Sequence, residues 1–434
     1  MLDSHDPLVA LADTINWGKF DDSFEKYYSV DGRPAKPIRM MVGLLILKQL
    51  ENLSDENAVL QWKRNPYYQY FCGMTEYQPA LPCDASDLVY FRKRIGKEGV
   101  EEIFGESVSL HGKAVEEKQV IIDTTVQEKN VTYPTDGKLA IKMIHHLHCI
   151  AKDEEIQLRR TYVKEIKGHR ISLRFFRHPK KIKKARAAMK RLKTITRILI
   201  RDISRNLNEK QLEKYQETFD LFLKVSDQKQ KDSNKIYSLH EQHIYVIAKG
   251  KDHKKYEYGT KASLVTTMKS NVIIGVCAHE KNEHDSKTLD AALASANKHR
   301  TKPIIEAICD RGYRGKKEVD GTAICIPDSP KKRDTKYQKE QKRKKFRKRA
   351  AIEPIIGHVK SDHRMQRNYL KGFIGDEINL LLAASASNFK KWMNNFLAVI
   401  FMVKLLMISL LFAHIRVEKK QKYANLYLIN YKLW

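Results

Sequence analysis

The chain has 434 residues, of which 42% are hydrophobic and 31% are charged. This composition excludes a disordered or fibrous protein, and the length favours two or three folding units. The formal net charge of +29 at pH 7 makes nucleic acid the first partner to consider, although proteins that bind anionic membranes carry similar charges.

The cysteines and the first residues of the chain indicate the compartment. The six cysteines are scattered and form no Cys-x-x-Cys pair, so neither a zinc ribbon nor a disulfide framework is favoured. The N-terminus has no basic region followed by an apolar core and a cleavage site, so no export signal is visible. We therefore expect a cytoplasmic protein.

Residues 1–118 predict a small all-α domain. Pro37 suits the first turn of a helix, and residues 37–63 read as two helices separated by a turn at 52–55. Ser86 is a suitable N-cap for a third helix. A helix-turn-helix DNA-binding domain and a helical dimerisation module explain this pattern equally well.

Residues 119–375 predict an α/β domain with a mixed sheet. Asp123 lies in an apolar, β-branched run that is typical of a buried strand. Further strands are indicated at 244–248, 262–267, 272–277, 303–309 and 322–327, with a helix at 286–298. Residues 138–235 predict a helical insertion, whose basic stretch from Arg177 to Arg201 favours phosphate contact over a merely solvated helix face.

Two segments towards the C-terminus have unusual compositions. Between Lys331 and Arg349, twelve of nineteen residues are Lys or Arg, and such a charge run is expected to form a flexible loop. Residues 376–434 are expected to form a helical, apolar tail. Its run from Phe396 to Ile415 is long enough to span a bilayer, but Lys404 opposes insertion, so a packed or self-associating helix is favoured.

Three acids stand where metal-dependent chemistry would need them. Asp123 lies inside an apolar strand, Asp310 follows another, and Glu353 precedes a proline at the expected start of a helix. Each acid alone also fits an ordinary turn or helix-start role. Together, three carboxylates from separate elements are the minimal device for binding two Mg²⁺ ions beside a phosphodiester. Lys360, seven residues after Glu353, would share its helix face.

The surroundings of these acids resemble those of a known family. Arg349, Glu353 and Lys360, in the spacing Arg-x3-Glu-x6-Lys and followed by Ser361 to Gly372, resemble the glutamate region of insertion-sequence transposases. The resemblance is closest to the insertion-sequence-five family, within the insertion-sequence-four-like superfamily. It spans most of the chain through four further segments: Asp31-Gly32-Arg33-Pro34, Asp123-Thr124-Thr125-Val126 with the downstream Tyr133-Pro134-Thr135-Asp136, Asp310-Arg311-Gly312-Tyr313-Arg314-Gly315, and the apolar tail after Asn388-Phe389.

This resemblance implies a fold and a reaction. The fold would be ribonuclease-H-like, with Asp123 on the first strand, Asp310 on the fourth and Glu353 on a later helix. The three acids would hold two Mg²⁺ ions, for which Mn²⁺ could substitute. The enzyme would cut DNA at the ends of a mobile element, and the freed 3′-hydroxyl would attack target DNA without a covalent protein intermediate.

The resemblance also implies the DNA contacts and partners. Arg349 and Lys360 would grip phosphates at the element's end, and the further candidates for DNA contact are Arg364, Lys342, Arg343, Lys344 and Lys345. A related signature has Tyr where this chain has Phe346, which leaves stacking on a base but no hydroxyl. The expected partners are the terminal inverted repeats, target DNA and at least one further copy of the chain, in the cytoplasm at the nucleoid and not at a membrane.

Two other functions remain open from the residues alone. A ribonuclease-H-like nuclease without strand transfer would need the same three acids. A DNA-binding protein with decayed catalysis would need only the helical domain and the basic segments.

Overall fold

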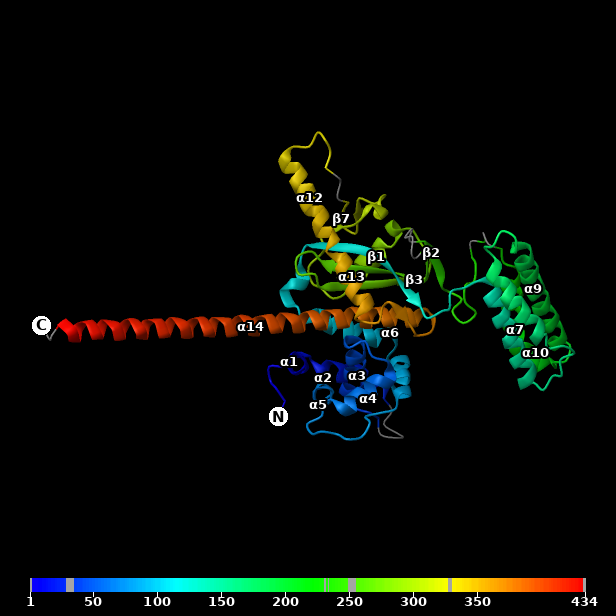
Figure 1. Cartoon of the computed structure of the whole chain (residues 1–434), viewed down its shortest axis with the longest axis horizontal. Helices are drawn as coiled ribbons and strands as arrows, with labels where there is room; N and C mark the ends of the chain where they lie inside the picture. The colour runs from blue at the N-terminus through cyan, green and yellow to red at the C-terminus, as the bar shows by residue number, and fades with distance from the viewer. Residues whose placement is uncertain are drawn as a thin grey trace.

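The computed structural model describes residues 2–28, 35–229, 232, 234–248, 255–326 and 330–431, with side chains to residue 409. The Asp31-Gly32-Arg33-Pro34 segment lies outside these residues. The described chain forms a mixed sheet with helices against it, a separate helical bundle and one long C-terminal helix (Figure 1). The predicted α/β class is confirmed, and the architecture is consistent with a ribonuclease-H-like fold.

The N-terminal region is helical, as predicted. Its elements are α1 (Pro7–Thr14), α2 (Trp17–Phe24), the short 3-10 helix η1 (Glu25–Tyr27), α3 (Ile38–Leu50), α4 (Asp55–Arg64), α5 (Pro66–Phe71), α6 (Ala85–Ser109) and η2 (Gly112–Glu116). The prediction that Ser86 caps the third helix is wrong. Asp84 is the cap, because its carboxylate accepts the Ser86 N–H at 2.8 Å while Asp87 binds the Asp84 N–H at 3.0 Å.

The sheet is built around strand β1. Its strands are β1 (Gln119–Lys129), β2 (Tyr245–Ala248), β3 (Tyr256–Thr267), β4 (Ile273–His279), β5 (Glu306–Ile308), β6 (Glu318–Val319), β7 (Thr322–Cys325) and β8 (Arg367–Asn368). The order is β2-β3-β1-β5-β7-β6, with β4 on β3 and β8 on β1. Strand β1 is antiparallel to β3 and parallel to β5, so it is covered on both edges.

Helices hold the sheet from both sides. The short helix η4 (Asp285–Lys287) leads into α11 (Leu289–Asn297), which packs on β4 so closely that a Cβ at Gly275 would lie 2.6 Å from the Ala296 nitrogen. The 3-10 helix η5 (Arg311–Tyr313) follows β5, and α13 (Ile352–Ser361) lies against β1.

The helical insertion has a hydrophobic core of its own. It consists of α7 (Asp136–Asp153), α8 (Val163–Ser172), η3 (Leu173–Phe175), α9 (Ile182–Ser204) and α10 (Glu209–Asp227). Leu147, Leu192 and Phe222 lie in its core. Figure 1 shows this bundle to one side of the sheet, beyond the ends of β1, β2 and β3.

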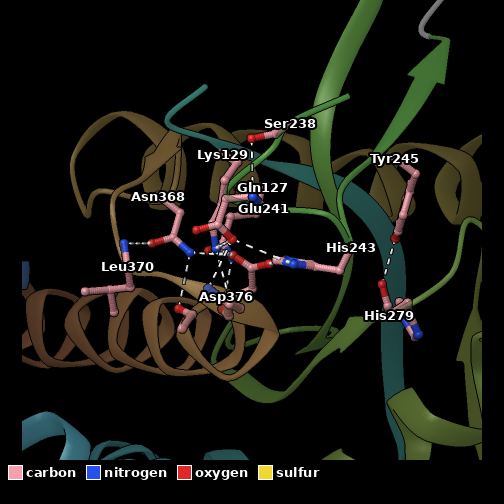
Figure 2. A network of polar contacts seen from close by, with 12 residues as sticks. Gln127, Lys129, Ser238, Glu241, His243, Tyr245, His279, Asn368, Leu370 and Asp376 are labelled. Atoms are coloured by element: carbon pink, nitrogen blue, oxygen red, sulfur yellow. Dashed lines mark hydrogen bonds and ion pairs between the residues drawn. The ribbon is translucent and has the colours of Figure 1, made fainter. Parts of the chain in front are cut away.

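A buried polar network fastens the far end of β1 to the start of the last helix, α14 (Gly372–Tyr431). The Lys129 ammonium lies 2.6 Å from an Asp376 oxygen and 3.3 Å from Glu241, which belongs to the segment returning from the insertion. His243 and Asn368 bind the same Asp376 carboxylate, at 2.9 and 2.6 Å (Figure 2). Three segments distant in sequence are therefore joined through one buried carboxylate.

The basic run before Glu353 is not a loop, as its composition predicted, but a helix. Helix α12 (Lys336–Ala350) begins with a capping box in which Thr335 and Gln338 satisfy each other's backbone N–H groups. Lys, Arg, Gln and Glu are good helix formers, which stabilises the helix despite its charge. It projects away from the sheet and ends next to α13 (Figure 1).

Helix α14 has a buried part and an exposed part. Up to Met393 it packs between the N-terminal helices and the sheet. From Leu397 to Ile408 its large apolar side chains are exposed, apart from the half-buried Ile400, so this part of the tail does not pack within one chain. The side chains of the predicted run beyond residue 409 lie outside the described residues, and self-association stays a prediction. One helix, between Gly372 and Ser409, is long and apolar enough to cross a membrane, and a single such helix is weak evidence for a membrane protein.

Candidate active site

Asp123 is a largely buried carboxyl in the middle of β1. Its side chain is 15% exposed, and one oxygen accepts the Thr124 N–H at 2.8 Å. Burial raises the pKa of Asp123 to about 6, while that N–H and the nearby Arg349 oppose the rise. The charges of Asp310 and Glu353 raise it further, so both of these acids lie within electrostatic reach.

Asp310 follows the end of β5, the strand that pairs in parallel with β1. Ile121 of β1 pairs with Ile308 of β5, and each acid follows its paired isoleucine by two residues. Asp310 caps η5 by accepting the Gly312 N–H at 2.8 Å. Asp310 therefore lies two residues after the end of β5 and not on the expected fourth strand, and β5 is the fifth strand in chain order because the short edge strand β2 precedes β3.

Glu353 lies in the first turn of α13, as its place before proline predicts. It is 61% exposed, and its carboxylate is 2.8 Å from the Arg349 guanidinium. Arg349 also lies 3.6 Å from Asp123. The guanidinium therefore bridges the first and third acids, whereas the sequence assigned it to a phosphate.

The donor chemistry of the three acids suits a hard divalent cation. Carboxylate oxygens are the ligands that Mg²⁺ prefers, and a buried carboxyl such as Asp123 is stabilised by a cation. Over the described part of the chain, however, no three His, Cys, Asp or Glu side chains gather closely enough to hold an ion. In this structure the Arg349 guanidinium provides the positive charge between Asp123 and Glu353 instead.

A fourth acid, which the sequence analysis did not select, borders the site. Asp285 accepts a hydrogen bond from the Thr124 hydroxyl at 3.1 Å and pairs with Lys261 at 3.0 Å. A Cβ at Gly312 would lie 2.8 Å from Asp285 and 2.9 Å from Asp310. An acid that follows β4 just before a helix was the available sequence signal, but its contact with Thr124 joins positions 161 residues apart.

The predicted DNA-contacting residues fall into two groups. Arg349 lines a cavity of about 300 Å³ together with Asp310 and Phe346, and Lys360 lies further along the same helix as Glu353. Arg364 donates to the Asn52 carbonyl at 3.2 Å, beside the N-terminal helices. The other group lies on α12, where three of the four cations have acidic neighbours: Lys342 with Asp334 at 2.8 Å, Lys344 with Glu340 at 3.2 Å and Lys345 with Glu306 at 3.1 Å.

Comparison with known proteins identifies the class. Residues 1–94 match a family described as a transposase domain (DUF772), and residues 225–389 match one described as a transposase DDE domain. The second match includes Asp310 and Glu353, and Asp123 lies between the two matched ranges.

One curated relative aligns with part of the chain. The uncharacterized protein ORF8 in the nfe locus of Rhizobium meliloti is 42% identical over 176 residues, which is 39% of this chain and 85% of the relative. No solved structure matches the chain. With a transposase domain and a transposase DDE domain matched in order along it, the chain belongs to the DDE transposases.

Proposed function

We propose that this transposase cuts DNA at the ends of a mobile element and joins the freed ends to target DNA, using Asp123, Asp310 and Glu353 as metal ligands. The observation that supports the proposal is that Asp123 lies on β1, Asp310 follows the end of the paired strand β5, and Arg349 contacts both Asp123 and Glu353. The motifs around these acids favour the insertion-sequence-five family as the nearest relatives.

Each residue has a role in this proposal. Two Mg²⁺ ions, or Mn²⁺, would neutralise the scissile phosphate and activate the attacking oxygen. Asp123 lies on β1 and Asp310 in the turn directly after the paired strand β5, so the pairing of the two strands limits how far the carboxylates can move apart. Arg349 leaves the carboxylates for a phosphate, because a bidentate guanidinium suits a phosphate as well as it suits a carboxylate. Lys360 contacts a second phosphate from the same helix as Glu353.

The triad is tested by isosteric substitutions. We expect Asp123→Asn, Asp310→Asn and Glu353→Gln each to reduce Mg²⁺-dependent cleavage of cognate-end DNA at least about 100-fold, since each removes a charged ligand. Binding of the ends in a gel-shift assay should stay within about threefold. Asp362→Asn is the matched control, because Asp362 is an exposed acid at the end of α13 whose neighbours are His358 and Ser361.

Two outcomes separate this function from its alternatives. A protein that cuts but yields no product joined to target DNA is a nuclease of the same fold. A protein whose three variants match the unmodified chain in every cleavage assay has catalysis elsewhere or none, which contradicts the proposal. We further propose that synapsis of two ends needs at least two copies of the chain, working in the cytoplasm on inverted repeats and target DNA.

A further inference from the structure

Two adjoining clefts lie where the helical insertion joins the sheet, away from the three acids. The first, here the aromatic cleft, has a volume of about 640 Å³ and is lined by residues of the β1–α7 connection, the α8–α9 region and strands β2 and β3. Five of its side chains are aromatic: Tyr133, Phe176, Tyr237, Tyr256 and Tyr258.

Three aromatic side chains of the aromatic cleft are exposed to solvent. Tyr133, Phe176 and Tyr256 are 52%, 43% and 47% exposed, although side chains of this kind are usually well covered. Tyr258 packs against two of the other rings. Its ring centroid lies 5.4 Å from the centroids of Tyr133 and Tyr237, and it meets the Tyr133 ring edge-on. A group of packed aromatic rings with exposed rings beside it suits a planar, aromatic ligand.

The second, here the basic cleft, has a volume of about 590 Å³ and shares Thr135 and Leu173 with the first. The residues that line it include no acid, and its charged or titratable members are Lys138, Lys142, His145, Arg170 and Arg174. Lys138 and Lys142 are directed to the β1–α7 connection by bonds to the Tyr133 carbonyl and the Thr132 hydroxyl, both at 3.1 Å. This cleft is built to attract an anion.

Among the described residues that line the aromatic cleft, Asp136 is the one acid, and its charge is neutralised by a neighbouring lysine. Asp136 is paired with Lys235 at 2.8 Å, and both line that cleft along with Arg177. The pair is neutral, and Arg177 adds one positive charge. A ligand with a flat ring and a neighbouring phosphate would therefore find stacking in one cleft and cations in the other.

We propose that the paired clefts bind an unpaired nucleotide of the DNA substrate, with its base stacked in the aromatic cleft and its flanking phosphates on the basic cleft. The proposal rests on the proposed function for the presence of DNA. In an intact duplex both faces of a base are covered by the neighbouring base pairs, so no protein ring can stack on it. The aromatic cleft can therefore bind only a nucleotide that has left the helix or lies in a single strand. Stacking alone makes the site tolerant of sequence.

The test uses a fluorescein-labelled 12-nucleotide oligothymidylate with one central 2-aminopurine, and a 12-base-pair duplex for comparison, both in EDTA. We expect Tyr256→Ala to weaken oligothymidylate binding about tenfold, since a stacked base contributes ~1–3 kcal/mol. The quenching of 2-aminopurine should be lost as well. Duplex binding should stay within about twofold, and Tyr256→Phe, which keeps the ring, should bind like the unmodified chain.

The controls keep the two proposals apart. Tyr77→Ala removes a 58% exposed tyrosine of the N-terminal region and should leave every binding constant unchanged. All of these measurements are of binding in EDTA, where no metal-dependent cleavage occurs, so a failure of the catalytic proposal would not alter their results. Equal weakening of single strand and duplex by Tyr256→Ala, or unchanged 2-aminopurine quenching, would overturn the nucleotide site.

Discussion

Among single residues, Asp123 and Glu353 differ most in their surroundings. Asp123 is 15% exposed and Glu353 is 61% exposed, although one guanidinium contacts both. A buried carboxyl without a metal is costly to ionise, whereas an exposed one is not. We therefore expect the protonation of Asp123 to control metal binding, and its negative charge to lower the free energy of unfolding.

The pKa of about 6 for Asp123 predicts how pH affects both properties. Below pH 6 a proton competes with the metal, so Mn²⁺ affinity measured by calorimetry should fall about fivefold between pH 6 and pH 5. Because the folded pKa lies above the unfolded one, the group favours the folded state fully below pH 4, and this contribution is lost as pH rises through 6.

Asp123→Asn should therefore stabilise the metal-free protein at pH 7, by up to about 3 kcal/mol, and have little effect at pH 4. Denaturant unfolding at the two pH values measures this difference. A variant that is less stable at pH 7 than the unmodified chain would show that Arg349 compensates the buried charge fully.

Among elements, β1 could be predicted and α12 could not. The apolar β-branched run around Asp123 has only one good solution, a buried strand, and the strand formed with the expected centre. In the run before Glu353 the high charge predicts a loop, whereas the capping pair Thr335 and Gln338 favours a helix, and composition alone does not decide between the two. The Asp285 contact could not be foreseen, because strand pairing and helix packing bring it to Thr124.

The charges on α12 are not equivalent, which sharpens their expected contribution to DNA binding. Lys342 and Lys345 pair with Asp334 and Glu306 of other segments, whereas Lys344 contacts only an exposed acid of its own helix and Arg343 is exposed. We expect Arg343→Gln with Lys344→Gln to lower the slope of log affinity against log salt by about 2. The matched double variant Lys342→Gln with Lys345→Gln should lower this slope less. An equal decrease of the slope in both double variants would contradict the expected difference between the paired and the exposed cations.

The buried network at the end of β1 predicts a stability difference between two lysines. Lys129→Met would leave Asp376 and Glu241 as buried carboxylates without their cation, at a cost of about 3–5 kcal/mol. Lys97→Met is the control, because Lys97 forms a pair of the same length, 2.6 Å, with Glu377 but is 41% exposed, so its loss should cost less than about 1 kcal/mol. Urea unfolding measures the free energy of unfolding of both variants. An equal decrease in the two would refute the role of burial.

At the scale of the whole molecule, α14 divides into a structural half and a dispensable half. Phe389 and Met393 are buried in the main core, while most large apolar side chains between Leu397 and Ile408 are exposed. A chain ending at residue 398 should keep its melting temperature within about 2 °C. A chain ending at residue 386 loses both core residues and should unfold, since removing a single buried aromatic side chain costs about 3–5 kcal/mol. Similar melting of the two truncations would disprove this division.

The same helix determines when the protein can complete its fold during synthesis. Asn388 donates to the Ile273 carbonyl of β4 and the Ser107 hydroxyl of α6, so it joins the sheet to the N-terminal helices. The main core therefore contains residues from Leu8 to Met393. It cannot be completed until Met393 has left the ribosome. The insertion, with its separate core, can fold earlier. The nascent transposase thus remains incomplete, and exposed to chaperones and proteases, until its last helix emerges.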